Sequence, residues 1–235
     1  PLITTRVLVT NSNCTGSTPN GSVTIQVNGG ADPVTDFLIE WFEGTGTTVA
    51  LGTNFGLTAG VNGETAQELP AGTYTVRVTD NTTPGNSCVA TTTFTITDDL
   101  PVIGIDNPDI TITHQTDCAP VNGLAEVTDV FVNGVAAGGV AGFTFEWLES
   151  DGTTVIAGSG NGPVIGVPLG AGNYFVRATS QTSSCTSPMT GFTVNDIHVD
   201  PLITSTVLVS NSNCTGSTPN GLVTIQVNGG VDPVT

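Results

Sequence analysis

The chain has 235 residues, and its 20 acidic residues against three arginines and no lysine give a formal net charge of −17 at pH 7. This charge excludes nucleic acid as a partner, because phosphate binding needs a basic surface. Thr, Val, Gly and Asn dominate, and no segment has a sustained helical period, so the predicted fold class is all-β. No apolar stretch of membrane length is present, and we expect no membrane insertion.

The last 35 residues repeat the first 35. Segment 201–235 differs from segment 1–35 at only five positions, and the period of this repeat is 200 residues. Such a copy predicts that the sequence is a segment of a longer tandem array.

A weaker repeat lies inside this period. Segment 37–49 resembles segment 143–155, with Trp41 matching Trp147, and segment 69–77 resembles segment 169–177. Each period therefore contains two related domains of about 100 residues, a size that can bury an adequate core. The predicted domains are 1–100 and 101–200, and residues 201–235 are the first strands of an incomplete third domain.

Alternating apolar residues predict the strands of the first domain. In segment 22–28, for example, Val23, Ile25 and Val27 fall on one face. We also expect one or two short edge strands within the Gly-rich segment 44–63. The predicted strands, in chain order, are 2–10, 22–28, 37–42, 73–79 and 89–97, with a polar loop at 11–21.

The second domain follows the same plan, with strands predicted at 110–114, 124–132, 143–148, 173–179 and 191–194. Trp41 and Trp147 lie within the third predicted strand of their domains, and Tyr74 and Tyr174 lie where a chain corner enters the fourth. A buried strand tryptophan and a corner tyrosine are typical of immunoglobulin-like sandwiches. The predicted architecture is therefore a tandem of immunoglobulin-like β-sandwiches with these four aromatic residues in the cores.

The five cysteines occupy equivalent places in the repeats: Cys14, Cys88, Cys118, Cys185 and Cys214. Cys214 is the copy of Cys14 in the next period. No CxxC motif or paired histidine accompanies them, so they are interpreted as extracellular disulfide cysteines rather than metal ligands.

Two disulfide schemes remain open, because a sequence does not fix connectivity. Cys14 and Cys88 are expected at opposite ends of a sandwich. A seven-residue strand spans about 23 Å, whereas bridged Cα atoms are at most about 7 Å apart. Bonds within domains, Cys14–Cys88 and Cys118–Cys185, therefore require the loop to cross the domain. Head-to-tail stacking instead allows a staggered Cys14–Cys185 bond, and Cys118 would then bond the next such cysteine along the array.

Each domain also has a predicted ion pair between neighbouring strands. These are Glu40–Arg77 and Glu146–Arg177, each worth roughly 0.2–1 kcal/mol when exposed. The outward-facing apolar residues Leu38, Phe42 and Leu148 are candidates for lateral contacts between copies, and cover by an edge strand is the alternative.

Acidic residues near the joints could hold calcium and stiffen the linkers, although solvated turn aspartates are commoner. No other cofactor is expected. His114 and His198 have no companion at ligand spacing, and no catalytic motif is found, so we do not expect an enzyme. The candidate calcium ligands are Asp98, Asp99, Asp106, Asp109, Asp196 and Asp200.

Several motifs of the first domain carry a family resemblance. They are Cys14-Thr-Gly, the run Asn20-Gly-Ser-Val-Thr-Ile, Trp41, the run Ala71-Gly-Thr-Tyr-Thr-Val and the closing Cys88. This pattern resembles the SprB-type and PKD-like repeats of giant Bacteroidetes surface adhesins. The resemblance implies a cell-surface or extracellular fibre of many immunoglobulin-like modules, exported by a dedicated secretion system and used in adhesion or gliding motility.

Two function hypotheses follow. The first is a structural segment of a long extracellular filament or cell-surface adhesin, whose partners are neighbouring repeats and other copies of itself. The second is a module that binds surface glycans through the variable loops 44–63 and 133–142, which lack the Trp and Tyr side chains that commonly stack on sugars.

Overall fold

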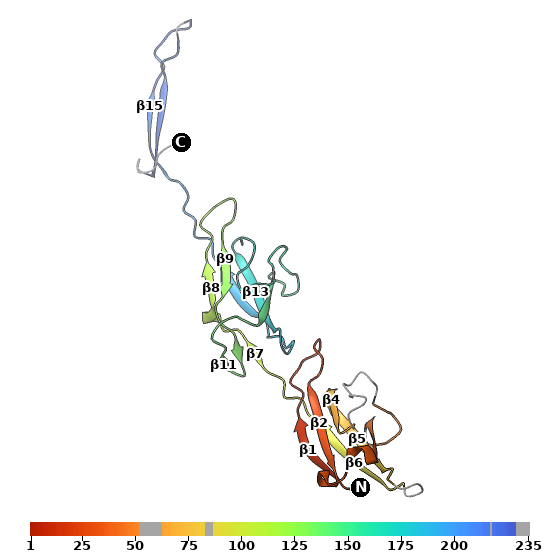
Figure 1. Cartoon of the computed structure of the whole chain (residues 1–235). Helices are drawn as coiled ribbons and strands as arrows, with labels where there is room; N and C mark the ends of the chain where they lie inside the picture. Colours follow the sequence, from red (N-terminus) through yellow and green to blue (C-terminus); the bar gives the residue numbers. More distant parts are fainter. Residues whose placement is uncertain (52–62, 83–86, 217, 229–235) are drawn as a thin grey trace.

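A computed structural model describes residues 1–51, 63–82, 87–216 and 218–228. The described elements are β-strands apart from three 3₁₀ turns at Asn28–Gly30, Val34–Asp36 and Asn107–Asp109. The predicted all-β class is therefore confirmed for these residues. Figure 1 shows the elements in three groups that follow one another along an elongated chain. Among the described residues, no helix is long and apolar enough to cross a membrane.

The first group consists of two antiparallel three-stranded sheets. One has the order β1 (Ile3–Val9), β2 (Gly21–Val27), β4 (Thr65–Leu69), and the other has the order β3 (Phe37–Glu43), β5 (Gly72–Asp80), β6 (Val89–Ile96). The predicted edge-strand region, 44–63, lies partly outside the described residues. An edge strand is nevertheless found just after it, as β4.

Both sheets of the first group contribute to one core. The alternation in β2 buries Val23, Ile25 and Val27, each at most 2% exposed. They pack in one cluster with Trp41 from β3 and Tyr74 from β5. The Tyr74 hydroxyl donates to the carbonyl of Pro70 at 2.8 Å, which is the corner geometry expected from the sequence. Burial raises the pKa of Tyr74, and the nearby Glu43 charge adds to the rise.

The second group has its own core. β12 (Phe143–Leu148), β13 (Gly172–Ser180) and β14 (Thr190–Val194) form one sheet, and β8 (Ile110–Thr113) pairs with β9 (Leu124–Val127). Trp147 is fully buried here and meets Phe192 edge to face at 5.8 Å. The Tyr174 hydroxyl donates to the carbonyl of Gly170 at 3.1 Å. We call the two groups, with their separate cores, the first and second units.

The second unit departs from prediction in its second strand. The predicted strand 124–132 ends at Val127, because the Asp129 carboxylate accepts the backbone N–H groups of Val130 and Gly139, both at 2.8 Å, and so holds a turn. The chain then forms a small separate sheet that the sequence did not predict. It has the order β11 (Val135–Ala136), β10 (Phe131–Val132), β7 (Ile103–Gly104).

The third group is a hairpin of β15 (Ile203–Val209) and β16 (Leu222–Val227), which is antiparallel like the pair of β1 and β2 and differs from it in the position of one bulge. Its apolar face is open. Val223 is 66% exposed whereas Val23 is fully buried, and Ile225 is 45% exposed whereas Ile25 is 1% exposed. The same strands therefore bury their apolar face only when the remaining strands of a unit cover it.

Gly21 lies where β2 passes closest to the opposite side of the first core. A Cβ atom there would sit 2.4 Å from the carbonyl oxygen of Leu69 and 2.8 Å from Ile96. We expect Gly21→Ala to lower the free energy of unfolding of the first unit by about 1–3 kcal/mol, measured by denaturant titration. The control is Gly46→Ala, because the Cβ there would meet only Thr48 at 3.9 Å. Equal stability of the two variants would contradict the close packing at Gly21.

Candidate functional site

The candidate site is the joint between the two units, and its first half is the loop from Asn11 to Asn20, here called the cysteine loop. The Asn11 side chain is 5% exposed, and its amide nitrogen donates to the Asp98 carboxylate at 2.7 Å. Its side-chain oxygen accepts the N–H groups of Asn13 and Asn20. These bonds fix the loop between β1 and β2 and set the position of Cys14 within it.

The second half is the segment 181–189 between β13 and β14, here called the cysteine turn. Ser180, at the end of β13, receives a 2.9 Å hydrogen bond from the N–H of Ser184 and donates its own N–H to Cys185 at 2.9 Å. Cys185 is only 2% exposed and belongs to the core cluster of the second unit. The turn therefore holds its cysteine against a packed core.

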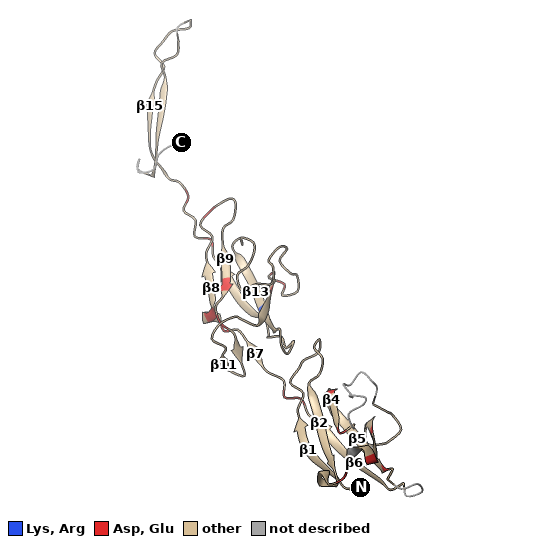
Figure 2. Ribbon diagram, viewed as in Figure 1, with Lys and Arg blue, Asp and Glu red and all other residues tan. Residues whose placement is uncertain are grey.

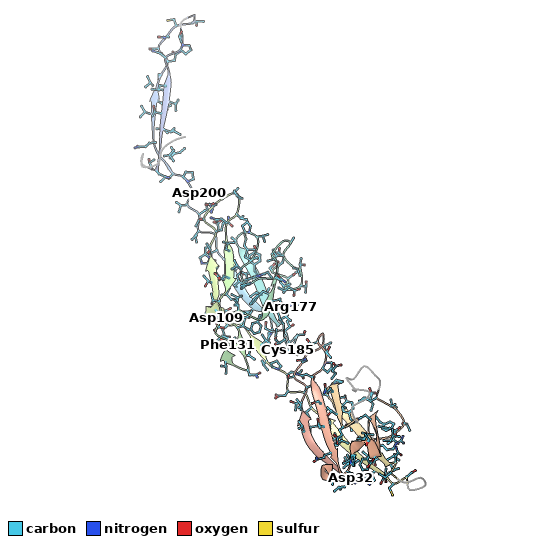
Figure 3. All side chains as sticks on the ribbon, in the orientation of Figure 1. Asp32, Asp109, Phe131, Arg177, Cys185 and Asp200 are labelled. Carbon is cyan, nitrogen blue, oxygen red and sulfur yellow. A yellow bond between two sulfur atoms is a disulfide. The ribbon has the colours of Figure 1, made fainter. Side chains whose placement is uncertain are left out.

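A disulfide joins the two halves. The Cys14 and Cys185 sulfur atoms are 2.08 Å apart and their Cα atoms are 5.0 Å apart. Two hydrogen bonds flank the disulfide: the Cys14 N–H donates to the Ser183 carbonyl at 2.7 Å, and the Ser17 and Ser184 hydroxyls are 2.6 Å apart. Figure 3 labels Cys185 at the end of the second unit that faces the first. The joint is thus fixed covalently and by hydrogen bonds.

The structure forms the staggered bond, and the alternative pairings within domains are wrong. Cys88 and Cys118 are free and exposed, as is Cys214. The reason is the geometry expected from strand length. Within one unit, the cysteine that follows the first strand and the cysteine that precedes the last strand lie at opposite ends of the strands. Each cysteine can therefore reach only a cysteine of the neighbouring unit.

The cysteine loop keeps its shape without a partner. In the copy around Cys214, the Asn211 side-chain oxygen again accepts the N–H groups of Asn213 and Asn220, at 3.2 and 3.0 Å. The Ser212 N–H donates to the Asn220 side-chain oxygen at 2.9 Å, as the Ser12 N–H does to that of Asn20 at 2.7 Å. Because these bonds form although Cys214 is free, the loop's own sequence is sufficient to present the cysteine.

Both predicted ion pairs are present between neighbouring strands. Glu40 lies opposite Arg77, with the Arg77 Nε donating to the carboxylate at 2.8 Å, and Glu146 lies opposite Arg177 in the same way. Each side chain of the Glu40–Arg77 pair is 33% exposed, so its contribution to stability is small. Figure 2 shows how rare basic positions are along the described ribbon.

The candidate lateral contacts need correction. Phe42 and Leu148 are 5% and 1% exposed, whereas Leu38 alone is open, at 48%. The chain folds back over the first two, through bridges of Phe42 to Ala50 and of Leu148 to Val155, and Arg77 stacks on the Phe42 ring. Phe42 and Leu148 are therefore covered by an edge segment of their own unit and are not available for lateral contacts between copies.

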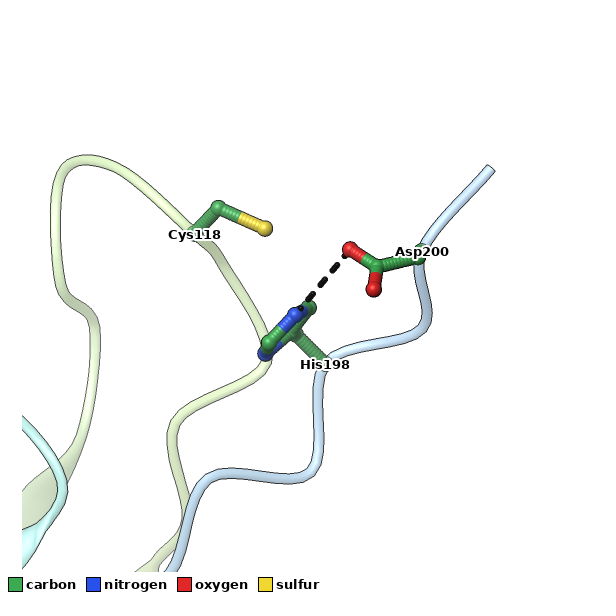
Figure 4. Close-up of side chains that lie close together, drawn as sticks. All are labelled: Cys118, His198 and Asp200. Atoms are coloured by element: carbon green, nitrogen blue, oxygen red, sulfur yellow. Dashed lines mark hydrogen bonds and ion pairs between the residues drawn. The ribbon is translucent and has the colours of Figure 1, made fainter. Parts of the chain in front are cut away.

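The candidate calcium ligands do not gather. Among the described residues, the one group of three possible metal ligands is Cys118, His198 and Asp200, whose ligand atoms lie within 4.8 Å of one another (Figure 4). It includes Asp200 but none of the other five linker aspartates, so the structure gives no support for calcium there. Thiolate and imidazole are instead ligands that zinc accepts.

His198 is therefore more than the isolated linker residue expected from the sequence. Its Nδ1 lies 2.5 Å from the Asp196 carboxylate and its Nε2 lies 3.2 Å from that of Asp200. The spacing of 196, 198 and 200 was a visible signal, because alternate residues of an extended chain share one side. The proximity of Cys118, 80 residues away, left no signal of that kind in the sequence.

The hydrogen bond that the His198 imidazole donates to the Asp196 carboxylate raises the pKa of His198, and the negative charges of Asp196 and Asp200 add to the rise. The charged pair is therefore present between the lowered pKa of Asp196 and the raised pKa of His198, and it is lost as the pH rises through the latter. We expect Asp196→Asn to bring this pKa back toward its ordinary value, as followed by NMR of the imidazole protons. Asp109→Asn is the control, and an unchanged His198 titration in Asp196→Asn would contradict the contact.

An open cavity of about 710 Å³ lies at the joint, between the cysteine loop, the linker and the cysteine turn. Its lining includes Asn13, Asp99, Asn133, Phe143 and Ser183. Phe143 is the one aromatic residue among the lining residues, so the groove lacks the stacked rings that commonly hold sugars.

No protein-family model and no curated protein matches the sequence. Among solved structures, the chain is similar to three N-terminal domains of the highly immunogenic outer capsid protein (Hoc) of bacteriophage RB49, with a TM-score of 0.32 and 13% identity over 96% of this chain and 68% of that one. It is also similar to SGBP-B of the Bacteroides ovatus mixed-linkage glucan utilization locus, determined with a mixed-linkage heptasaccharide, with a TM-score of 0.24 and 10% identity over 92% of this chain and 75% of that one. Similarities this low indicate nothing about function.

Proposed function

We propose that this chain is a structural segment of a long extracellular filament or cell-surface adhesin, built from tandem immunoglobulin-like domains that disulfides join end to end. It is not an enzyme, and its partners are neighbouring repeats and further copies of itself. The observation that supports this proposal most directly is the Cys14–Cys185 bond, which connects one end of the first unit to the facing end of the second. A bond in this place fixes a linear order of units, which is what a filament requires.

The repeat supports the same proposal. The hairpin of β15 and β16 restarts the first unit after 200 residues, with the cysteine loop already formed around Cys214. Further units can then be added by the same joint. The two sheets of the first unit, one with β1, β2 and β4 and the other with β3, β5 and β6, support the proposed immunoglobulin-like plan.

The charge and the disulfide support an extracellular location. A disulfide persists in an oxidising compartment, such as the cell surface. The formal charge of −17 makes parallel copies repel one another, which keeps a long thread soluble. A surface adhesin of the SprB-like or PKD-like kind, as the sequence motifs imply, fits both properties.

Electron microscopy tests the proposal. A protein of several 200-residue periods, imaged in negative stain, is expected to form a thin thread of beads with two beads in each period. Thicker, regularly periodic filaments would mean that the units also bind laterally, and the proposal would then include self-assembly as their role. Collapsed, globular particles would contradict a linear filament.

A further inference from the structure

We infer that the Cys14–Cys185 disulfide carries tension past both units, so that the chain transmits a pull almost without lengthening. The bond spans 171 positions and encloses residues 15–184 in a covalent loop. Of the 200 residues in one period, only the 30 in segments 1–14 and 185–200 lie outside this loop. A force applied to the two ends of a period therefore passes through these two segments and the sulfur–sulfur bond.

Both load-bearing segments are already largely extended. Segment 1–14 contains β1, which runs along the first unit toward the joint, and segment 185–200 contains β14, which runs along the second unit away from it (Figure 1). A strand rises about 3.3 Å per residue and a fully stretched chain about 3.5 Å. Strands so close to full extension have almost no slack to release.

The disulfide changes the available extension several-fold. The 30 residues outside the loop can reach about 100 Å, whereas all 200 residues of an unbonded period can reach about 700 Å. Most residues of the two cores, Trp41 and Trp147 among them, lie inside the loop, so their unfolding cannot lengthen the chain, whereas Phe192 and Val194 of the second core lie in the load-bearing segment 185–200. One bond thus removes residues 15–184, which belong to both units, from a pull along the array.

This load path continues in the repeat. Segment 201–214 copies segment 1–14, and only 29 positions separate Cys185 from Cys214. The hydrogen bonds of the cysteine loop also form around Cys214. The biological role of this load path rests on the proposed filament function, whereas its resistance to lengthening depends on the disulfide alone. Lengthening of the oxidised chain under force would therefore contradict the load path but not the filament. Collapsed particles in the electron microscope would contradict the filament but not the load path.

Single-molecule force spectroscopy tests the load path. The 235-residue chain is held by peptide tags at its two ends and pulled with the Cys14–Cys185 bond verified by mass spectrometry. We expect no lengthening from residues 15–184 in the oxidised chain. In reductant, or in Cys14→Ser, steps adding up to about 600 Å are expected. Cys88→Ser combined with Cys118→Ser should behave as the unchanged chain, and steps of several hundred ångströms with the bond intact would overturn the inference.

A second observation assigns partners to Cys88 and Cys118, two of the three free cysteines. Asp80, at the end of β5, donates its N–H to the carbonyl of Cys88 at 2.9 Å, as Ser180 does to Cys185. Gln115 precedes Cys118 by three residues, as Asn11 precedes Cys14, and both bridge to the strand-end linker of their unit. Cys88 therefore occupies the place of Cys185, and Cys118 occupies the place of Cys14.

The geometry assigns Cys118 to a disulfide with the copy of Cys88 in the following unit. Both cysteines are exposed thiols in this chain. Their bond forms when they give up two protons and two electrons to the disulfide of a thiol oxidoreductase, which becomes a dithiol. Every joint would then have a disulfide beside its peptide linker, and the array would have two covalent load paths.

The test extends the chain at Thr235 with a copy of residues 36–100, which completes a third unit. Cys88→Ser in the first copy removes the competing thiol. After oxidation, peptide mapping without reductant is expected to join Cys118 to the added copy of Cys88. A free Cys118 would overturn the assignment, as would a Cys118 that binds added zinc with His198 and Asp200, the contact that Figure 4 shows.

Discussion

Cys14→Ser is expected to lower the summed free energy of unfolding of the two units by about 5 kcal/mol, because the disulfide closes a 171-position loop and so restricts the unfolded chain. The measurement is a guanidinium chloride titration followed by tryptophan fluorescence. Trp41 and Trp147 report on one unit each, since they are the two tryptophans of the chain.

The matched control is Cys88→Ser, at an exposed and free thiol. This variant is expected to remain within about 0.5 kcal/mol of the unchanged chain. If Cys14→Ser and Cys88→Ser unfold alike, the Cys14–Cys185 bond does not stabilise the pair of units. A separation of the two tryptophan signals in Cys14→Ser alone would show in addition that the disulfide couples the unfolding of the units.

Trp147→Ala is expected to destabilise the second unit by about 3–5 kcal/mol, because it leaves a cavity where a fully buried ring packs against Phe192. It also removes the indole N–H that donates to the Gly162 carbonyl at 3.2 Å. Thermal unfolding followed by circular dichroism should show an earlier transition for the second unit.

Trp41 provides the internal control for this substitution. It lies in the separate core of the first unit, so its fluorescence transition should stay in place in Trp147→Ala. Met189→Ala, at a side chain that is 47% exposed in the second unit, should have little effect. A simultaneous loss of the Trp41 signal in Trp147→Ala would mean that the two cores do not fold separately.

The regular strands could be predicted because their alternation is local. The predicted 143–148 matches β12, and the predicted 89–97 differs from β6 by one residue. The Glu40–Arg77 pair followed from the same alternation, once the two strands were taken as neighbours. The prediction of Phe42 as a lateral contact was wrong, because alternation assigns a residue to a face of the sheet but does not say whether another segment covers that face.

The joint could be predicted only in part. Strand length indicated that a bond between Cys14 and Cys88 would require the loop to cross the domain, and both disulfide schemes stayed open. The choice of Cys185 depends on how whole units stack, which no local pattern encodes. The proximity of Cys118 to His198 depends on the path of the linker from β14 to Pro201, which is two residues longer than the linker from β6 to Pro101. The early end of β9 depended on two hydrogen bonds to Asp129, one of them from a residue ten positions away.

Tryptic mapping without reductant tests the central claim most directly. Because the chain has three arginines and no lysine, trypsin yields segments 1–6, 7–77, 78–177 and 178–235. We predict that segment 7–77 is disulfide-linked to segment 178–235, with fragment ions placing the bond at Cys14 and Cys185. A link from segment 7–77 to segment 78–177, which contains Cys88, would contradict the stapled joint and the load path built on it.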